Sequence, residues 1–129
     1  MNTYDPATEE KLRKLLAENL RYPREAYEFI SEALAYTSQM FDQEGHVSGQ
    51  QLCEGCRRLA LERLGYLART VLQSWNVRTT DDFGRLVYNM IGSDLLRKAE
   101  ADSVRDFHDV YDFEQAFDRT FRIELETSS

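Results

Sequence analysis

The chain has 129 residues, of which 42% are hydrophobic and 30% are charged. This balance is typical of a single folded domain over residues 1–129 and excludes a disordered chain, because enough apolar side chains are present to form a core. The formal net charge of −7 argues against a general nucleic-acid binder or a protein that lies on an anionic membrane.

The first third of the chain predicts two helices. Asp5 and Pro6 are typical of a helix start, and apolar residues then recur at helical spacing, at Leu12, Leu15, Leu16 and Leu20. Pro23 begins a second predicted helix that continues to Phe41. Its apolar residues cover about half of the helix circumference, which indicates a central helix with several neighbours. Residues 42–46 end it.

The stretch HVSGQQLCEGCRR predicts a third helix, over residues 49–64. Ser48 and Gln51 have the spacing of a capping box, and Gly65 is a typical helix stop. Both cysteines of the chain, Cys53 and Cys56, fall on the apolar face of this helix.

The two cysteines have three interpretations. They could bind a metal together with His46 and His108, or act as a redox pair, or pack as small apolar side chains. A redox pair needs an exposed thiol at a helix N-terminus, and a zinc site usually places its cysteines on a turn. We therefore expect buried thiols without metal, and we expect no cofactor.

The next two predicted helices follow Gly65. Residues 67–75 form one apolar face that ends at Trp75, which we expect to be buried against the helix 23–41. Thr79 or Thr80 then caps a helix that ends at Gly92. Asp81 and Asp82 lie in its first turn, where negative charge is favoured.

The region after Gly92 is acidic and has few apolar residues. We predict short extended segments at residues 95–98 and 110–113, a helical turn or two over 114–121, and a strand over 121–125. Residues 1–4 and 126–129 are expected to be flexible ends. The predicted fold is therefore a mainly α domain of about five helices with a small C-terminal β-hairpin or extended segment, which has the element order of a winged helix.

A winged helix would make residues 79–92 the recognition helix and would present Arg78, Arg85, Tyr88 and Asn89 to nucleic acid. Two aspartates at its start and the acidic segment behind it would repel phosphate. We therefore expect little binding to duplex DNA at physiological salt. The favoured function is a small protein–protein interaction or regulatory module that acts on another protein or by self-association.

An enzyme is the third hypothesis. His108 lies within an acidic segment, Asp106–Asp112, that could supply acid–base catalysis or bind a hard metal ion. Dense carboxylates in one loop are more often an exposed rim, and we assign no catalytic residue. The N-terminal stretch does not have the pattern of a secretion signal and no apolar run has membrane length, so we expect a cytoplasmic protein without membrane contact.

Four blocks of the sequence are distinctive: YPREAYEFI, HVSGQQLCEGCRRLAL, TVLQSWNVRTTDDFGRLVYNMI and DVYDFEQAF. Over about Tyr22 to Phe117 the chain resembles an uncharacterised family of short bacterial proteins of the planctomycete type. The resemblance implies a bacterial, cytosolic protein, but it implies no activity, substrate or cofactor. Related chains carry aliphatic residues where this one has Cys53 and Cys56, which argues against a thiol-based function.

Overall fold

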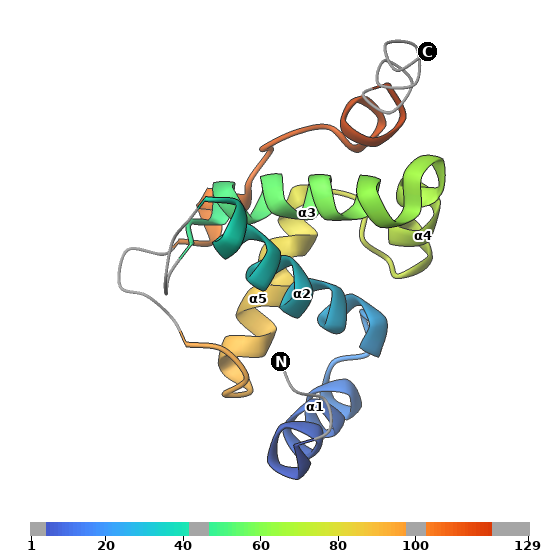
Figure 1. Ribbon diagram of the computed structural model, residues 1–129. Helices are drawn as coiled ribbons and strands as arrows, with labels where there is room; N and C mark the ends of the chain where they lie inside the picture. The colour runs from blue at the N-terminus through green and yellow to red at the C-terminus, as the bar shows by residue number, and fades with distance from the viewer. Residues whose placement is uncertain (1–4, 42–46, 98–102, 120–129) are drawn as a thin grey trace.

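The structure, a computed structural model, describes residues 5–41, 47–97 and 103–119. These residues form a helical domain, and none of them lies in a β-strand. In chain order the helices are α1 (Pro6–Glu18), α2 (Arg24–Met40), α3 (Gly49–Leu64), α4 (Ala68–Ser74) and α5 (Thr80–Gly92). Three short turns complete the described chain: the 3-10 turns η1 (Gly65–Leu67) and η2 (Val104–Phe107), and the π-helical turn η3 (Glu114–Arg119) (Figure 1).

Helix α2 is the centre of the domain, as its broad apolar face predicts. It packs against both α3 and α5, and α3 crosses the pair (Figure 1). The closest approach is at Gly55, where a Cβ atom would lie 1.7 Å from Thr37 Oγ1. Only glycine allows α2 and α3 to come this close. The large fully buried side chains come from all five helices and the C-terminal turn, and they include Leu12, Tyr27, Ile30, Leu52, Leu72, Phe83, Leu86, Met90 and Phe117.

The helix starts and stops predicted from the sequence are confirmed. Asp5 caps α1 and Ser48 caps α3, where Ser48 and Gln51 bond reciprocally at 2.9 and 3.1 Å. Gly65 ends α3 with a φ of 54°, a left-handed conformation that favours glycine. Thr79 precedes the first turn of α5. These boundaries follow local backbone chemistry, which a sequence carries directly.

The predicted contact of Trp75 with helix α2 is confirmed, but its predicted burial is not. Its ring lies 5.8 Å from that of Phe29 on α2, so it packs against the predicted helix. The side chain is only half-buried, however, because it lies in the turn after α4, where solvent reaches its outer side.

The predicted β-hairpin and winged-helix pattern are wrong for the part of the chain that the structure describes. Residues 95–97 form a bend and an irregular segment after α5, and 110–112 form a bend and a loop rather than strands. Serine and aspartate side chains cap short helical turns here: Ser103 N donates to Asp106 and Gln115 N donates to Asp112. These local hydrogen bonds stabilise helical turns, so the segment does not adopt the extended conformation that strand pairing needs.

Widely spaced aromatic residues anchor the same segment to the domain. Phe107, Phe113 and Phe117 are buried, and the rings of Phe113 and Phe117 meet edge-to-face at 4.9 Å. The predicted helical turn from Glu114 is confirmed as far as Arg119. The predicted strand over 121–125 and the predicted flexible ends, residues 1–4 and 126–129, lie outside the described residues.

Candidate functional site

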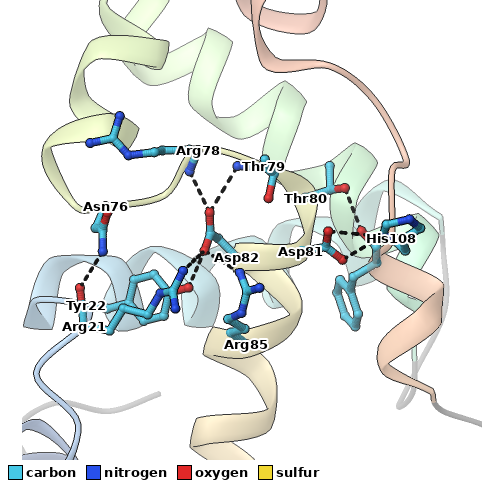
Figure 2. Close-up of polar contacts among 11 residues, drawn as sticks. Arg21, Tyr22, Asn76, Arg78, Thr79, Thr80, Asp81, Asp82, Arg85 and His108 are labelled. Atoms are coloured by element: carbon cyan, nitrogen blue, oxygen red, sulfur yellow. Dashed lines mark hydrogen bonds and ion pairs between the residues drawn. The ribbon is translucent and has the colours of Figure 1, made fainter.

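A buried carboxylate organises the corner where α5 begins. Asp82 is only 4% exposed, although it lies in the first turn of a helix. Its Oδ1 accepts a hydrogen bond of 2.5 Å from the Tyr22 hydroxyl, and its Oδ2 accepts from the backbone N–H groups of Arg78 (2.8 Å) and Thr79 (3.1 Å). Figure 2 shows these bonds converging on the one side chain. The carboxylate thereby joins the segment before α2 to the loop before α5.

The environment keeps Asp82 ionised. Burial is the largest single influence and raises the pKa of the carboxyl, but the bonds from Tyr22, Arg78 N and Thr79 N and the charge of Arg85 outweigh it, so the pKa lies below its ordinary value of 3.8. Burial and the bond to Asp82 raise the pKa of Tyr22 to about 12, so its hydroxyl remains a donor.

Two arginine side chains lie at this carboxylate near the surface, and a third arginine bonds to it through its backbone. Arg85 Nη1 lies 3.0 Å from Asp82 Oδ1, and Arg21 Nη2 lies 3.7 Å from the same oxygen. Arg78 donates its backbone N–H to Asp82 while its side chain extends away from the carboxylate (Figure 2). About half of the side-chain surface of Arg21 (51%) and Arg85 (47%) is exposed. Two guanidinium groups therefore share one carboxylate, and the guanidinium group of Arg78 is directed away from it.

An exposed leucine precedes Arg21 in the chain. Leu20 is 88% exposed in the linker between α1 and α2. The linker is held to the loop before α5, because Asn76 Nδ2 donates to the backbone oxygen of Arg21 at 3.3 Å. Arg21 also lies over the Tyr22 ring, with 5.7 Å between Cζ and the ring centroid. We call the group formed by Arg21, Arg78 and Arg85 around Asp82, together with Leu20 next to Arg21 in the chain, the arginine corner.

The two cysteines lie elsewhere, in the middle of α3, and their predicted burial is confirmed. Cys53 and Cys56 are both 0% exposed free thiols. Burial raises the pKa of Cys53 to about 12, with a contribution from the charge of Asp81, and raises that of Cys56 well above its ordinary value. Tyr111 lies against this part of α3 and donates its hydroxyl to the Cys53 backbone oxygen at 2.6 Å. Neutral, enclosed thiols are poor nucleophiles and poor metal ligands.

Of the two histidines proposed as metal ligands, only His108 lies within the described residues. His46 lies outside the described residues. His108 Nδ1 lies 3.2 Å from Asp81 Oδ2, at the start of α5 (Figure 2). No group of three or more His, Cys, Asp or Glu side chains within residues 5–41, 47–97 and 103–119 is arranged to hold a metal ion.

The acidic segment Asp106–Asp112, which the sequence offered as an enzyme site, forms hydrogen bonds that hold the fold together. Asp106 and Asp112 accept backbone N–H bonds that cap short turns. Next to them, the Thr80 hydroxyl donates to the backbone oxygen of Phe107 at 2.6 Å. The same hydroxyl accepts a hydrogen bond from Val110 N at 3.1 Å. The segment is thus bonded to the start of α5 rather than arranged around a pocket of carboxylates.

The residues predicted for nucleic-acid contact do not form one face. Arg78 and Arg85 belong to the arginine corner, but Tyr88 and Asn89 are half-buried, and Asn89 Nδ2 donates to the Tyr27 hydroxyl at 3.2 Å. The other arginines that could have joined them pair with carboxylates on the surface of α3 and η3: Arg57 and Arg58 with Glu54, and Arg69 with Asp118. A continuous basic surface is not formed by these residues.

Sequence reasoning missed the central role of Asp82. It treated the residue only as a first-turn charge that the helix dipole favours. The spacing of Asp82, Leu86 and Met90 could have placed it on the buried face, because residues four apart share one side of a helix. No sequence pattern links it to Tyr22, sixty residues earlier.

Comparison with family models, with curated proteins and with solved structures found no match. Among the described residues, no helix is long and apolar enough to cross a membrane.

Proposed function

We propose that the protein is a small binding module without catalysis of its own, which contacts another protein through the arginine corner. The observation that carries the proposal is the placement of the Arg21 and Arg85 side chains at a single buried carboxylate, to which Arg78 is also bonded through its backbone. Arginine is enriched at protein interfaces, where its planar head forms several directed hydrogen bonds. The proposed setting is the cytoplasm.

Asp82 favours this function because it holds the surface in place before a partner arrives. Its bonds fix the backbone at Arg78 and the position of Arg85, and Asn76 fixes the backbone at Arg21. A surface whose side chains are already ordered loses less conformational entropy on binding. Ordered arginines and an exposed leucine next to one of them in the chain have the composition of a protein interface, where an apolar centre is surrounded by polar residues.

The groups that the sequence offered for catalysis support the same proposal. The thiols are enclosed and neutral, His108 faces Asp81, and Asp82 is fully engaged with donors. A general base or nucleophile has to reach a substrate atom at hydrogen-bond distance. These groups instead hold the elements of the fold together.

Site-specific photocrosslinking in the native cell tests the proposal. A photoreactive phenylalanine analogue replaces Leu20, and in a matched variant it replaces Lys14, which is exposed on α1. We expect a defined protein adduct from position 20 and none from position 14. Equal adducts from both positions, or no protein adduct from position 20, would remove the arginine corner as the interface.

A further inference from the structure

We propose that the arginine corner recognises an acidic peptide segment of its partner, one in which carboxylate side chains flank an apolar residue. The inference rests on the proposed function and names the chemistry that the surface selects. It follows from the unused hydrogen-bonding capacity of the arginines, from the exposed leucine that precedes Arg21 and from the charge of the rest of the chain.

The arginines have donors to spare. A guanidinium group has five N–H donors, and carboxylates match its planar geometry. Arg85 directs one nitrogen to Asp82, Arg21 lies too far from Asp82 for a full hydrogen bond, and the Arg78 side chain forms no ion pair with any residue in the described ranges. Asp82 itself already accepts bonds from Tyr22 and two backbone N–H groups. A carboxylate of a partner could therefore bind the remaining arginine N–H donors without displacing Asp82.

Leu20 adds an apolar requirement. Its side chain is 88% exposed and precedes Arg21 in the chain, on a linker that the Asn76 bond holds in place. Burying such a side chain against an apolar residue of a partner is favourable because it removes apolar surface from water. A peptide that carries both carboxylates and an apolar side chain satisfies both parts of the surface.

Charge favours an acidic peptide over nucleic acid. Duplex DNA is a long polyanion, and strong binding to it needs many phosphate contacts on a continuous basic surface. The chain carries a net charge of −7. Arg57 and Arg58 are paired with Glu54 on the same helix, and Arg69 is paired with Asp118. A short acidic segment can contact the arginine corner alone and avoid the acidic remainder of the domain.

NMR titration of the full chain tests the inference. The probe is a short synthetic peptide of glutamate residues around one leucine, and the control peptide has glutamine in place of each glutamate. We expect the glutamate peptide to shift the Nε–Hε signals of Arg21, Arg78 and Arg85 saturably, with smaller shifts at Arg13 and Arg97, and we expect the glutamine peptide to shift none of them.

A pair of matched variants links the binding to the arginine corner. Arg21→Gln combined with Arg78→Gln is expected to weaken peptide binding by about tenfold, because both changes remove charge from the interface. Lys14→Gln combined with Arg97→Gln removes the same charge from other exposed positions and is expected to leave binding unchanged. Circular dichroism confirms that both variants are folded.

Four results would overturn the inference: no saturable shift, equal shifts at Arg13 and Arg97, tighter binding of a random DNA duplex through the same arginine signals, or self-association through them in the absence of peptide. The result is separable from the proposed function. If the peptide fails but the crosslink from position 20 still reaches a protein, the interface stands and the acidic chemistry is wrong. If the crosslink fails, the proposed function fails with it.

Discussion

Two buried titratable sites in this domain hold their side chains in opposite charge states. At the middle of α3, burial keeps the thiols of Cys53 and Cys56 neutral, with the pKa of Cys53 raised to about 12. At the start of α5, Asp82 is almost as deeply buried, yet its pKa is lowered and it remains a carboxylate. Burial alone therefore does not decide the charge of a side chain in this protein.

The difference comes from where each side chain lies on its helix. Backbone N–H groups within a helix are bonded to the preceding turn, so a side chain at mid-helix finds no free backbone donor. The first N–H groups of a helix, and those of the loop before it, are free. Asp82 uses such donors at Arg78 and Thr79, and Tyr22 and Arg85 add two more. A helix start can therefore stabilise a buried charge that the middle of a helix excludes.

The largest expected effect comes from removing the charged site. Asp82→Ala leaves the Tyr22 hydroxyl and two backbone N–H groups without their acceptor, and we expect a loss of about 3 kcal/mol in the free energy of unfolding. Urea denaturation measures the change. Asp81→Ala is the matched control, because Asp81 pairs with an exposed His108, and its loss is expected to cost less than about 1 kcal/mol. Equal costs for the two variants would mean that Asp82 is not the centre of this corner.

The neutral site should respond to polarity rather than to charge. Cys56→Ser replaces a packed sulfur with a hydroxyl in an apolar setting, and we expect it to cost about 1–3 kcal/mol. Cys56→Ala removes the sulfur without adding a polar group, so it separates the lost packing from the buried hydroxyl. Urea denaturation of both variants is the measurement. A serine variant more stable than the alanine variant would show that a bonding partner for the hydroxyl exists there.

The same contrast predicts that two tyrosines contribute differently to stability: Tyr22, just before α2, and Tyr27, on α2. Tyr22→Phe removes a hydrogen bond to a charged group, and we expect a cost of about 2 kcal/mol. Tyr27→Phe removes a bond with the neutral amide of Asn89, and we expect a cost of about 1 kcal/mol. Thermal denaturation of the two variants under identical conditions compares them. A larger loss for Tyr27→Phe would contradict an ionised Asp82.

The helical framework could be predicted from the sequence, because its signals are local. The Ser48–Gln51 capping box, the Gly65 stop and the apolar face of α2 each lie within a few turns of chain, and each predicted its element. The burial of Cys53 and Cys56 followed from their angular position on α3 in the same way. Local periodicity fixes which side of a helix faces the core, whatever the rest of the fold does.

The segment after α5 and the arginine corner could not be predicted, because long-range contacts decide both. Phe113 looks like a residue of an extended segment, and Phe107 like a loop residue, until the helices of the domain provide the surface that buries them. Asp82 looks like an ordinary first-turn acid until Tyr22 and Arg21 reach it from another helix boundary. Sequence spacing does not encode either set of long-range contacts. Local propensity therefore predicted the wrong structure for the segment after α5 and missed the role of Asp82.

The pKa of Asp82 in the folded protein tests the central claim most directly, that this carboxylate is buried and ionised beneath the arginines. Carbon-detected NMR of the side-chain carboxyl across an acid titration measures it. We predict a value below the ordinary 3.8, so the stability that Asp82 contributes is complete above that pH and is lost as the pH falls through the lower, folded value. A folded-state pKa above 3.8 would contradict the account, since desolvation would then outweigh the donors and the arginines would surround a carboxyl that burial tends to neutralise.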